Sequence, residues 1–437
     1  MSFPRYPAYK DSGVAWLGDI PVHWGIGQSR RLFALRNERA LNSDKQLTAS
    51  QVHGVIYQDD FIRMEGRRVV EVIKGADILK HVEPNDFVIS MRSFQGGIEW
   101  CQVRGCISSA YVMLAPCDRI HAPFFQYLLK SQSYIQALQT TSNLVRDGQA
   151  LRYDNFTQVD LPLVPLPEQT QIAAFLDRET AKIDALVAEQ RRLMALLKEK
   201  RQAVISHAVT RGLNPHAPMK PSGIEWLGDV PEHWVQSRIK YSLRGLIDTE
   251  HKTAPFFDDG EYLVVRTTNI KDGKLILEGG KYTNFDGYEE WTRRGKPVPG
   301  DIMFTREAPA GEACLVPEDV QLCMGQRTVL MQIDHDALDS LFALWSLYGG
   351  LASEFITILS QGSTVTHFNM SDISNIPIML PSVDEQREIA GFLESELAKF
   401  DTLTTEAQRA IDLLQERRTA LISAAVTGQI DVRGAVK

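Results

Sequence analysis

The sequence contains an internal repeat, and this duplication restricts the possible folds more than any other feature. Residues 12–24 (SGVAWLGDIPVHW) and 222–234 (SGIEWLGDVPEHW) are identical at nine of thirteen positions. A second matching pair, residues 168–186 and 385–403, follows in the same order. A tandem duplication explains both pairs, because motifs that recur in a fixed order are typical of repeated structural units. We therefore expect two copies of one unit, related by an internal pseudo-two-fold repeat.

The segments between the repeated motifs have diverged almost completely. Residues 25–160 and 235–376 share little sequence, but each is predicted to have a β-rich stretch followed by a helix. In both segments a turn leads into an apolar strand, and an amphipathic helix follows. The turns lie at 84–90 and 299–305, and the helices are expected at about 123–140 and 339–359. The pattern predicts a repeated frame that carries two variable inserts.

Each copy of the second motif begins a long helix with apolar residues at steps of three and four. This heptad pattern, held over about five heptads, favours a coiled coil over a surface helix. The expected seam residues are Ile172, Leu176, Ile183, Leu186, Leu193, Leu197 and Val204 in the first copy, and Ile389, Leu393, Phe400, Leu403, Ala410, Leu414 and Leu421 in the second. A helix of about 40–45 residues is roughly 60–68 Å long. The two helices most simply pair with each other, and separate packing of each helix on its own domain is the alternative.

The first motif, W-L-G-D-x-P-x-H-W, is rich in Trp, Gly and Pro and predicts a fixed, non-helical turn. His23 and His233 do not predict a metal site, because neither copy has a second His or Cys at ligand spacing. The tryptophans are expected to be buried or to anchor an interface. The resulting candidates for docking a partner are Trp16, Trp24, Trp226 and Trp234.

Composition indicates a folded multi-domain protein. The 437 residues are too many for one compact core, and 44% hydrophobic with 23% charged residues excludes a disordered chain. No apolar run reaches the roughly 18–20 residues of a membrane span, and the first residues lack the pattern of a secretory signal. The cysteines do not form a disulfide framework, and Cys101 and Cys106 are interpreted as core thiols. We expect a cytoplasmic protein.

Neither insert is strongly basic, so composition alone does not predict nucleic-acid binding. The first insert has 16 basic and 14 acidic residues, the second has 13 and 20, and the net charge of the chain is −8. A DNA-binding site would therefore be a local cluster, in which arginine could pair with guanine and glutamine with adenine. The candidates are Arg63, Arg67, Arg68, Arg92, Gln95, Arg104, Arg266, Arg293, Arg294, Thr305, Arg306 and Arg327. A solvated surface position is the alternative for each arginine.

The sequence lacks several common catalytic signatures. The sequence has no phosphate-binding loop, nucleophile elbow or zinc-protease helix, and no adenine-methyltransferase or nuclease core motif. Together with divergent inserts on a repeated frame, this favours a recognition protein with no catalytic residues and no metal site. The alternative is a coiled-coil interaction scaffold whose two variable domains bind proteins.

These features resemble the specificity (S) subunits, the HsdS family, of type I restriction-modification systems. The resemblance extends over the whole chain in order. In the first insert, the turn has Asn85 where a glycine is usual. The residues that carry the resemblance are the paired turn motifs at 16–24 and 226–234, the helix openings at 166–176 and 385–393, and Pro-Gly-Asp-Ile at 299–302.

The resemblance implies an α+β fold in which two α/β target recognition domains are separated by two long α-helices that form an antiparallel coiled coil. Each recognition domain would read one half of a bipartite, asymmetric DNA site. The conserved helices would dock two modification (methyltransferase) subunits, and restriction (endonuclease and translocase) subunits would join them. S-adenosylmethionine, ATP and Mg²⁺ would belong to these partners, with no cofactor in this chain.

The repeats and the resemblance together give the expected domain boundaries. In chain order they are an N-terminal conserved turn segment (1–24), target recognition domain 1 (25–160), the central long helix (161–212), the repeated turn segment (213–234), target recognition domain 2 (235–376), the C-terminal long helix (377–428) and a tail (429–437).

Overall fold

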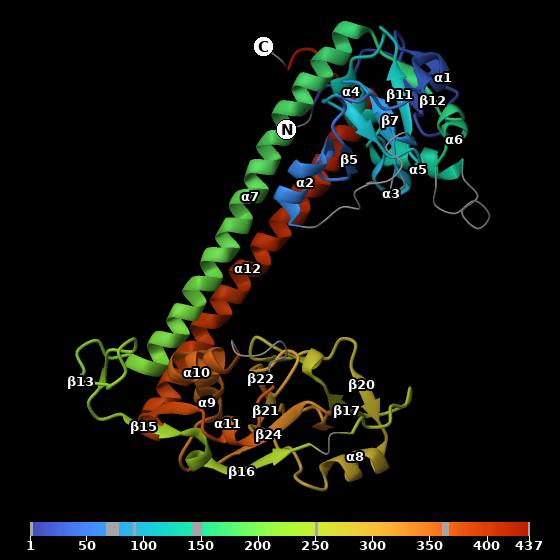
Figure 1. The fold of residues 1–437 in the computed structure, drawn as a ribbon. Helices are drawn as coiled ribbons and strands as arrows, with labels where there is room; N and C mark the ends of the chain where they lie inside the picture. Colours follow the sequence, from blue (N-terminus) through green and yellow to red (C-terminus); the bar gives the residue numbers. More distant parts are fainter. Residues whose placement is uncertain are drawn as a thin grey trace. The chain divides into compact units, whose positions relative to one another are not determined.

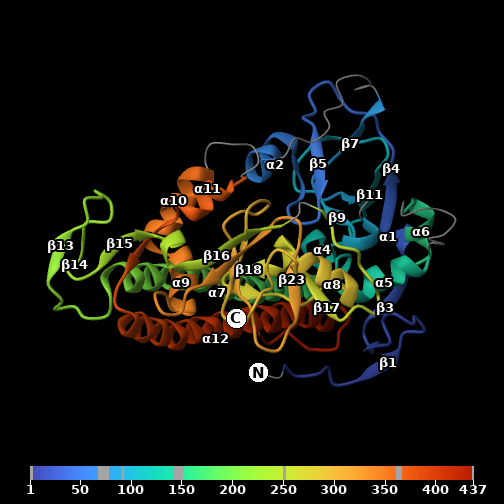
Figure 2. The same ribbon diagram turned by 90° about the horizontal axis from the view of Figure 1, so that it is seen from below.

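Two long antiparallel helices and two compact units make up the fold. The units are unit 1 (residues 1–190 and 408–437) and unit 2 (residues 191–407). Helix α7 (Leu166–Arg211) starts in unit 1 and ends in unit 2, and α12 (Val383–Val426) runs the opposite way (Figures 1 and 2). The computed structural model describes residues 3–66, 78–90, 93–141, 151–249, 252–360 and 367–435.

Unit 1 is built from short strands and helices that precede α7. They are β1 (Tyr9–Asp11), β2 (Asp19–Pro21), β3 (Gly25–Gln28), α1 (Ser29–Leu32), β4 (Phe33–Arg36), β5 (Leu47–Ser50), β6 (Gly54–Tyr57), α2 (Gln58–Glu65), β7 (Lys80–Val82), β8 (Phe87–Ile89), α3 (Ser93–Gly96), β9 (Glu99–Trp100), β10 (Gly105–Ile107), β11 (Val112–Pro116), α4 (Ala122–Leu128), α5 (Gln132–Thr140), α6 (Tyr153–Thr157) and β12 (Asp160–Leu163). The main sheet has the order β4-β11-β8-β9 and is antiparallel. Strands β3 and β12 pair with each other, so the first insert leaves and re-enters the frame at one place.

Unit 2 has the same plan between α7 and α12, with additional strands. Its elements are β13 (Met219–Pro221), β14 (Asp229–Pro231), β15 (Val235–Arg238), the 3₁₀ helix η2 (Ile239–Ser242), β16 (Leu243–Asp248), β17 (Tyr262–Val265), η3 (Thr267–Asn269), β18 (Ile270–Lys271), β19 (Lys274–Leu275), β20 (Lys281–Thr283), α8 (Phe285–Thr292), β21 (Ile302–Thr305), β22 (Ala313–Leu315), β23 (Leu322–Met324), β24 (Thr328–Ile333), α9 (Ser340–Tyr348), α10 (Gly350–Ser360), α11 (Met370–Ser374) and β25 (Pro377–Leu380). The main sheet has the order β16-β24-β21-β22, and β15 pairs with β25.

The two inserts therefore share one sheet topology despite their unrelated sequences. In both, the strand that follows the Pro-x-Asp turn lies at the third position of the sheet. Asn85 has φ 75° and Gly300 has φ 87°, so asparagine adopts the left-handed conformation that glycine has in the second copy. Each turn aspartate faces an arginine of the first strand, Arg36 in unit 1 and Arg244 in unit 2. This common architecture and the paired long helices confirm the predicted fold class.

Both expected insert helices are interrupted, which corrects the prediction of one helix at 123–140 and one at 339–359. In unit 1 the Ser131 side chain accepts a hydrogen bond from the backbone N–H of Tyr134 and starts α5. In unit 2 the break falls at Gly349 and Gly350, and Gly350 has φ 55°.

Among the described residues no single helix is long and apolar enough to cross a membrane. Helices α9 and α10 pass that test only as a pair, which is bent by 47°.

The helix seam differs from the expected one in its middle. Leu186, Leu193 and Leu403 are 51%, 43% and 51% exposed, so their assignment to the seam is wrong. The buried or half-buried positions in α7 are instead Ile183, Val187, Gln190, Met194 and Leu197, which keep alternating steps of four and three. The corresponding positions in α12 are Phe400, Thr404, Ala407, Ile411 and Leu414. Polar Gln190 and Thr404 occupy seam positions, and a search for apolar residues alone selects the neighbouring leucines.

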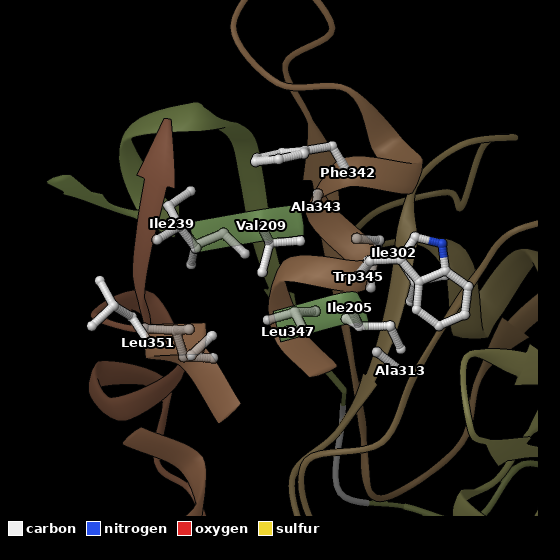
Figure 3. Packing of buried hydrophobic residues seen from close by; sticks show 14 of the residues in the cluster. Ile205, Val209, Ile239, Ile302, Ala313, Phe342, Ala343, Trp345, Leu347 and Leu351 are labelled. Atoms are coloured by element: carbon white, nitrogen blue, oxygen red, sulfur yellow. The ribbon is translucent and has the colours of Figure 1, made fainter. Parts of the chain in front are cut away.

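In unit 2 the long helices form part of the core of the insert. Ile205 and Val209 of α7 pack in one cluster with Phe342 and Leu347 of α9 (Figure 3). Leu393 of α12 belongs to the same cluster. Because frame and insert share one core, the insert is held rigidly on the helices and is not a domain on a flexible tether.

The corrected seam can be tested with two leucines of α7 that the sequence pattern treats as equivalent. Leu197→Ala should lower the free energy of unfolding by about 2–4 kcal/mol, because it removes a buried side chain. Leu193→Ala is the matched control and should cost less than about 0.5 kcal/mol. Urea unfolding of the isolated chain, followed by circular dichroism, measures both. Equal losses for the two variants would contradict the corrected seam.

Candidate functional site

In unit 2, two strands bring polar residues to one edge of a small sheet. Strands β17 and β23 pair in parallel, so the residues that follow them emerge side by side. Arg266 follows β17, and Gly325, Gln326 and Arg327 follow β23. A side chain at Gly325 would lie 2.3 Å from the backbone oxygen of Val265, so only glycine permits this close approach.

These residues line a pocket of about 230 Å³ that contains two guanidinium groups. Arg266 donates a hydrogen bond from Nη2 to the Gly279 oxygen at 3.0 Å, and its buried Nε has no partner among the described residues. Arg327 is half-exposed, with Nε 3.6 Å from Glu307 Oε2. No described residue that lines the pocket is acidic. The described lining therefore contributes two positive charges on a net-acidic insert, one of them beside Glu307.

The rest of the pocket adds neutral polar groups and an aromatic ring. Thr253 Oγ1 donates to Gln326 Oε1 at 3.3 Å, and Phe256 is 39% exposed beside them. Guanidinium and amide groups are the side chains that pair with base edges, and an exposed ring supplies apolar contact. The sequence candidates included Arg266 and Arg327 but missed Thr253, Phe256 and Gln326. Gln326 could have been identified from the sequence by its position beside Arg327 after an apolar strand.

The structure corrects two other candidates in unit 2. Thr305 is fully buried and Arg306 is 6% exposed. Both oxygens of Asp248 accept hydrogen bonds from Arg306 Nη1, and His367 Nε2 accepts one from Nη2. Arg306 therefore stabilises the insert and has no surface for a base. Arg293 and Arg294 are exposed at the end of α8, and they stay predictions.

In unit 1, the contacts of the described DNA-binding candidates do not bring these residues together into one site. Arg63 is exposed and pairs with Asp60 at 3.3 Å, and Gln95 is exposed in α3. Arg104 lies 3.6 Å from Asp44 and 3.7 Å from Glu83. These three stay predictions. The other three, Arg67, Arg68 and Arg92, lie outside the described residues.

Arg104 borders a buried histidine that lies between two carboxylates. His81 is 3% exposed, with Nδ1 2.7 Å from Asp44 Oδ2 and Nε2 2.8 Å from Glu83 Oε1. Burial acts to lower the pKa of His81, but the hydrogen bonds and charges of the two carboxylates outweigh it and raise that pKa above its usual value. The cluster therefore favours an imidazolium that donates from both nitrogens.

Each unit also contains a corner at which the repeated turn motif meets the start of a long helix. In unit 1, Glu168 accepts hydrogen bonds from Trp24 Nε1 at 3.1 Å and from His23 Nε2 at 2.8 Å. In unit 2, Glu385 accepts the equivalent bonds from Trp234 at 3.1 Å and His233 at 2.8 Å. One glutamate thus fixes each turn motif to its helix.

The neighbouring glutamine fixes the insert to the same helix start. Gln169 accepts a hydrogen bond from the backbone N–H of His121 at 2.8 Å and donates to the Arg119 oxygen at 2.9 Å. Gln386 makes the equivalent bonds to the backbone of Asp339 and Ala337. Both glutamines are buried, so the Glu-Gln pair of each repeat holds the turn motif on one side and the insert on the other.

The corners correct part of the docking prediction. Trp24 and Trp234 have no exposed surface, so they hold the frame together and do not dock a partner. Trp16 is half-buried, donates to the Asp160 oxygen at 3.1 Å and packs on Tyr134 at a ring distance of 5.6 Å. Trp226 is 53% exposed and stays a docking candidate.

The sequence of this chain is similar to the sequences of proteins named specificity subunits. Residues 243–412 match the family model described as type I restriction modification DNA specificity domain. The chain is 20% identical to the putative type I restriction enzyme MjaX specificity subunit of Methanocaldococcus jannaschii, over 95% of this chain and 96% of that protein. It is 22% identical to the type I restriction enzyme EcoBI specificity subunit of Escherichia coli, over 80% of this chain and 74% of that protein.

Two solved structures have the same fold. A chain from a study of complex assembly and conformational transition of the type I R-M system matches with a TM-score of 0.68 at 15% identity, over 93% of this chain and 98% of that one. The HsdS subunit of Thermoanaerobacter tengcongensis matches with a TM-score of 0.52 at 15% identity, over 94% and 98%. These matches show that the chain shares the fold of those two chains.

The chain is thus similar over most of its length to specificity subunits of type I restriction-modification systems, the family that the repeated motifs resemble. The family model itself covers residues 243–412. Both relatives are named specificity subunits.

The His81 cluster predicts a pH-dependent contribution to the stability of unit 1. A raised pKa in the folded state means that the contribution is complete below the unfolded value of about 6.5 and is lost as pH rises through the folded value. His81→Gln should therefore lower the free energy of unfolding more at pH 5.5 than at pH 8.5. Unfolding of both proteins at the two pH values measures this, with the exposed His207→Gln as control. A loss that is equal at both pH values, or larger at pH 8.5, would contradict the cluster's charge state.

Proposed function

We propose that this chain selects the DNA sequence for a type I restriction-modification complex, with one insert for each half of a bipartite, asymmetric site. One observation carries the proposal: two inserts with the same sheet and the same attachment have unlike sequences. The pocket between Arg266 and Arg327 follows β17 and β23, which lie outside the shared four-stranded sheet. Different side chains on one frame would read different bases.

Partners would supply the chemistry. The chain would dock two modification (methyltransferase) subunits and restriction subunits in the cytoplasm. S-adenosylmethionine, ATP and Mg²⁺ would bind in those subunits and not in this chain. The net charge of −8 supports this division of roles, because DNA affinity depends strongly on phosphate neutralisation and a basic partner would provide it.

The unit 2 pocket can be tested by charge removal. Arg266→Ala and Arg327→Ala should each weaken specific DNA binding by the assembled complex by about 1–3 kcal/mol, or roughly 5- to 150-fold, if each guanidinium pairs with a base. Lys281→Ala in β20 removes an exposed positive charge from the same insert and is the matched control. Gel-shift titration against specific and scrambled duplexes measures the ratio of the two affinities. Equal effects on both duplexes would assign the arginines to phosphate contacts.

The division of labour between the inserts can be tested by exchange. Replacing residues 25–160 by the insert of a relative should change one recognised half-site and leave the other half-site unchanged. The reason is that the first insert attaches to the frame through its own strand pair and its own helix start. Mapping the methylated adenines in a host that carries the hybrid and its modification subunit measures both half-sites. A change in both half-sites would overturn the assignment of one insert to one half-site.

A further inference from the structure

The two corners are equivalent in sequence but are not covered equally. In unit 1 the N-terminal segment and the tail lie over the helix start. Tyr6 donates a hydrogen bond from its hydroxyl to Glu168 Oε1 at 2.6 Å, and Phe3 packs edge-on against Phe175 at 5.1 Å. The guanidinium of Arg433 lies 4.9 Å from the centre of the Tyr6 ring. As a result Tyr6 is 4% exposed and Phe175 is fully buried.

In unit 2 the equivalent positions are open to solvent. Phe392, which corresponds to Phe175, is 39% exposed, and Leu213, which corresponds to Phe3, is also 39% exposed. His216 stands at the position of Tyr6 and is exposed. The Glu385 side chain is 25% exposed, whereas that of Glu168 is 7% exposed. The repeat therefore contains one covered and one uncovered copy of the same corner.

The uncovered corner forms a pocket of about 470 Å³ in front of Glu385. Glu168 Oε1 accepts two hydrogen bonds, from Tyr6 and Trp24, whereas among the described residues Glu385 Oε1 accepts one, from Trp234. Asp384 and Glu388 add two further carboxylates to the lining, and Arg211 adds one guanidinium. The pocket therefore suits a hydrogen-bond donor accompanied by a positive charge.

We propose that this corner of unit 2 is the docking site for a segment of a partner polypeptide that presents a tyrosine three residues after an apolar ring, beside an arginine. The occupant is deduced from unit 1, where the chain's own Phe3, Tyr6 and Arg433 fill the same corner. The tyrosine hydroxyl donates to Glu385, the ring three residues before it covers Phe392 and Leu213, and the arginine faces Asp384 and Glu388. This inference rests on the internal repeat and does not depend on DNA recognition.

The blocked hexapeptide Phe-Pro-Arg-Tyr-Pro-Ala, identical to residues 3–8, is a probe for this pocket. It is titrated into the full chain labelled with ¹⁵N at the tryptophan indoles. The Trp234 indole resonance should shift, because its N–H bonds to Glu385, while that of Trp24 should not, because Tyr6 already covers Glu168. No shift of Trp234 up to millimolar peptide, or an equal shift of Trp24, would overturn the proposal.

Three matched variants test the chemistry of the pocket. A peptide with phenylalanine in place of tyrosine should bind at least about tenfold more weakly, because it lacks the hydrogen bond to a carboxylate. Glu388→Gln, an exposed position, should weaken the arginine-bearing peptide several-fold while preserving the Trp234–Glu385 bond. His216→Tyr should place a tyrosine over Glu385 within the chain, raise the melting temperature and prevent peptide binding. Equal binding of both peptides, or unchanged binding to His216→Tyr, would overturn the proposal.

The oligomeric state of the chain alone distinguishes a different partner from a second copy. A second copy could present its own residues 3–8 to the corner only by withdrawing them from its unit 1. The proposal therefore expects a monomer in sedimentation at concentrations up to tens of micromolar. A dimer that dissociates in the Glu388→Gln variant would assign the corner to a second copy and overturn the assignment to a different polypeptide.

Discussion

The frame depends on one hydrogen-bonded carboxylate at the start of each long helix, buried in unit 1 and partly exposed in unit 2. Removing a glutamate from water costs several kcal/mol unless its oxygens find donors, and the indole and imidazole of the turn motif supply them in both units. The requirement for donors at a fixed place explains why Trp, His and Glu recur together in the two halves. In unit 2 the start of α12 also belongs to the core of the insert through Ile389, Ala390 and Leu393, so turn motif and insert are fixed to one stretch of helix.

The sequence predicted the frame well and the inserts poorly. Repeated motifs establish the two units, and the heptads establish the long helices, because both signals are redundant over many residues. The seam was misassigned at Leu186, Leu193 and Leu403, because Gln190 and Thr404 occupy seam positions that an apolar pattern does not recognise. The helix breaks at Ser131 and Gly350 depend on local caps and backbone conformation, which a 3.6-residue period does not reveal.

The candidate recognition residues show a second limit. Arg266 and Arg306 are equally good candidates in the sequence, yet one lines a pocket and the other is buried against Asp248. Pairing between distant strands decides the difference, because β17 and β23 meet only in the folded insert. A net negative charge of the insert likewise conceals a pocket whose described lining residues include no acidic one, since charge balance is an average and recognition is local.

The glutamine that follows this glutamate in each repeat has a consequence for the evolution of such chains. Gln169 and Gln386 hold their inserts through backbone N–H and C=O groups, which every residue type provides. These hydrogen bonds therefore place no demand on the insert's side chains, and in unit 2 that demand is confined to the apolar residues of the shared core. Mutation can rewrite the surface of an insert, and genetic recombination can replace it whole, without loss of these backbone hydrogen bonds. A gene with this design could acquire a new specificity in one crossover event, while the rest of the machinery stays unaltered.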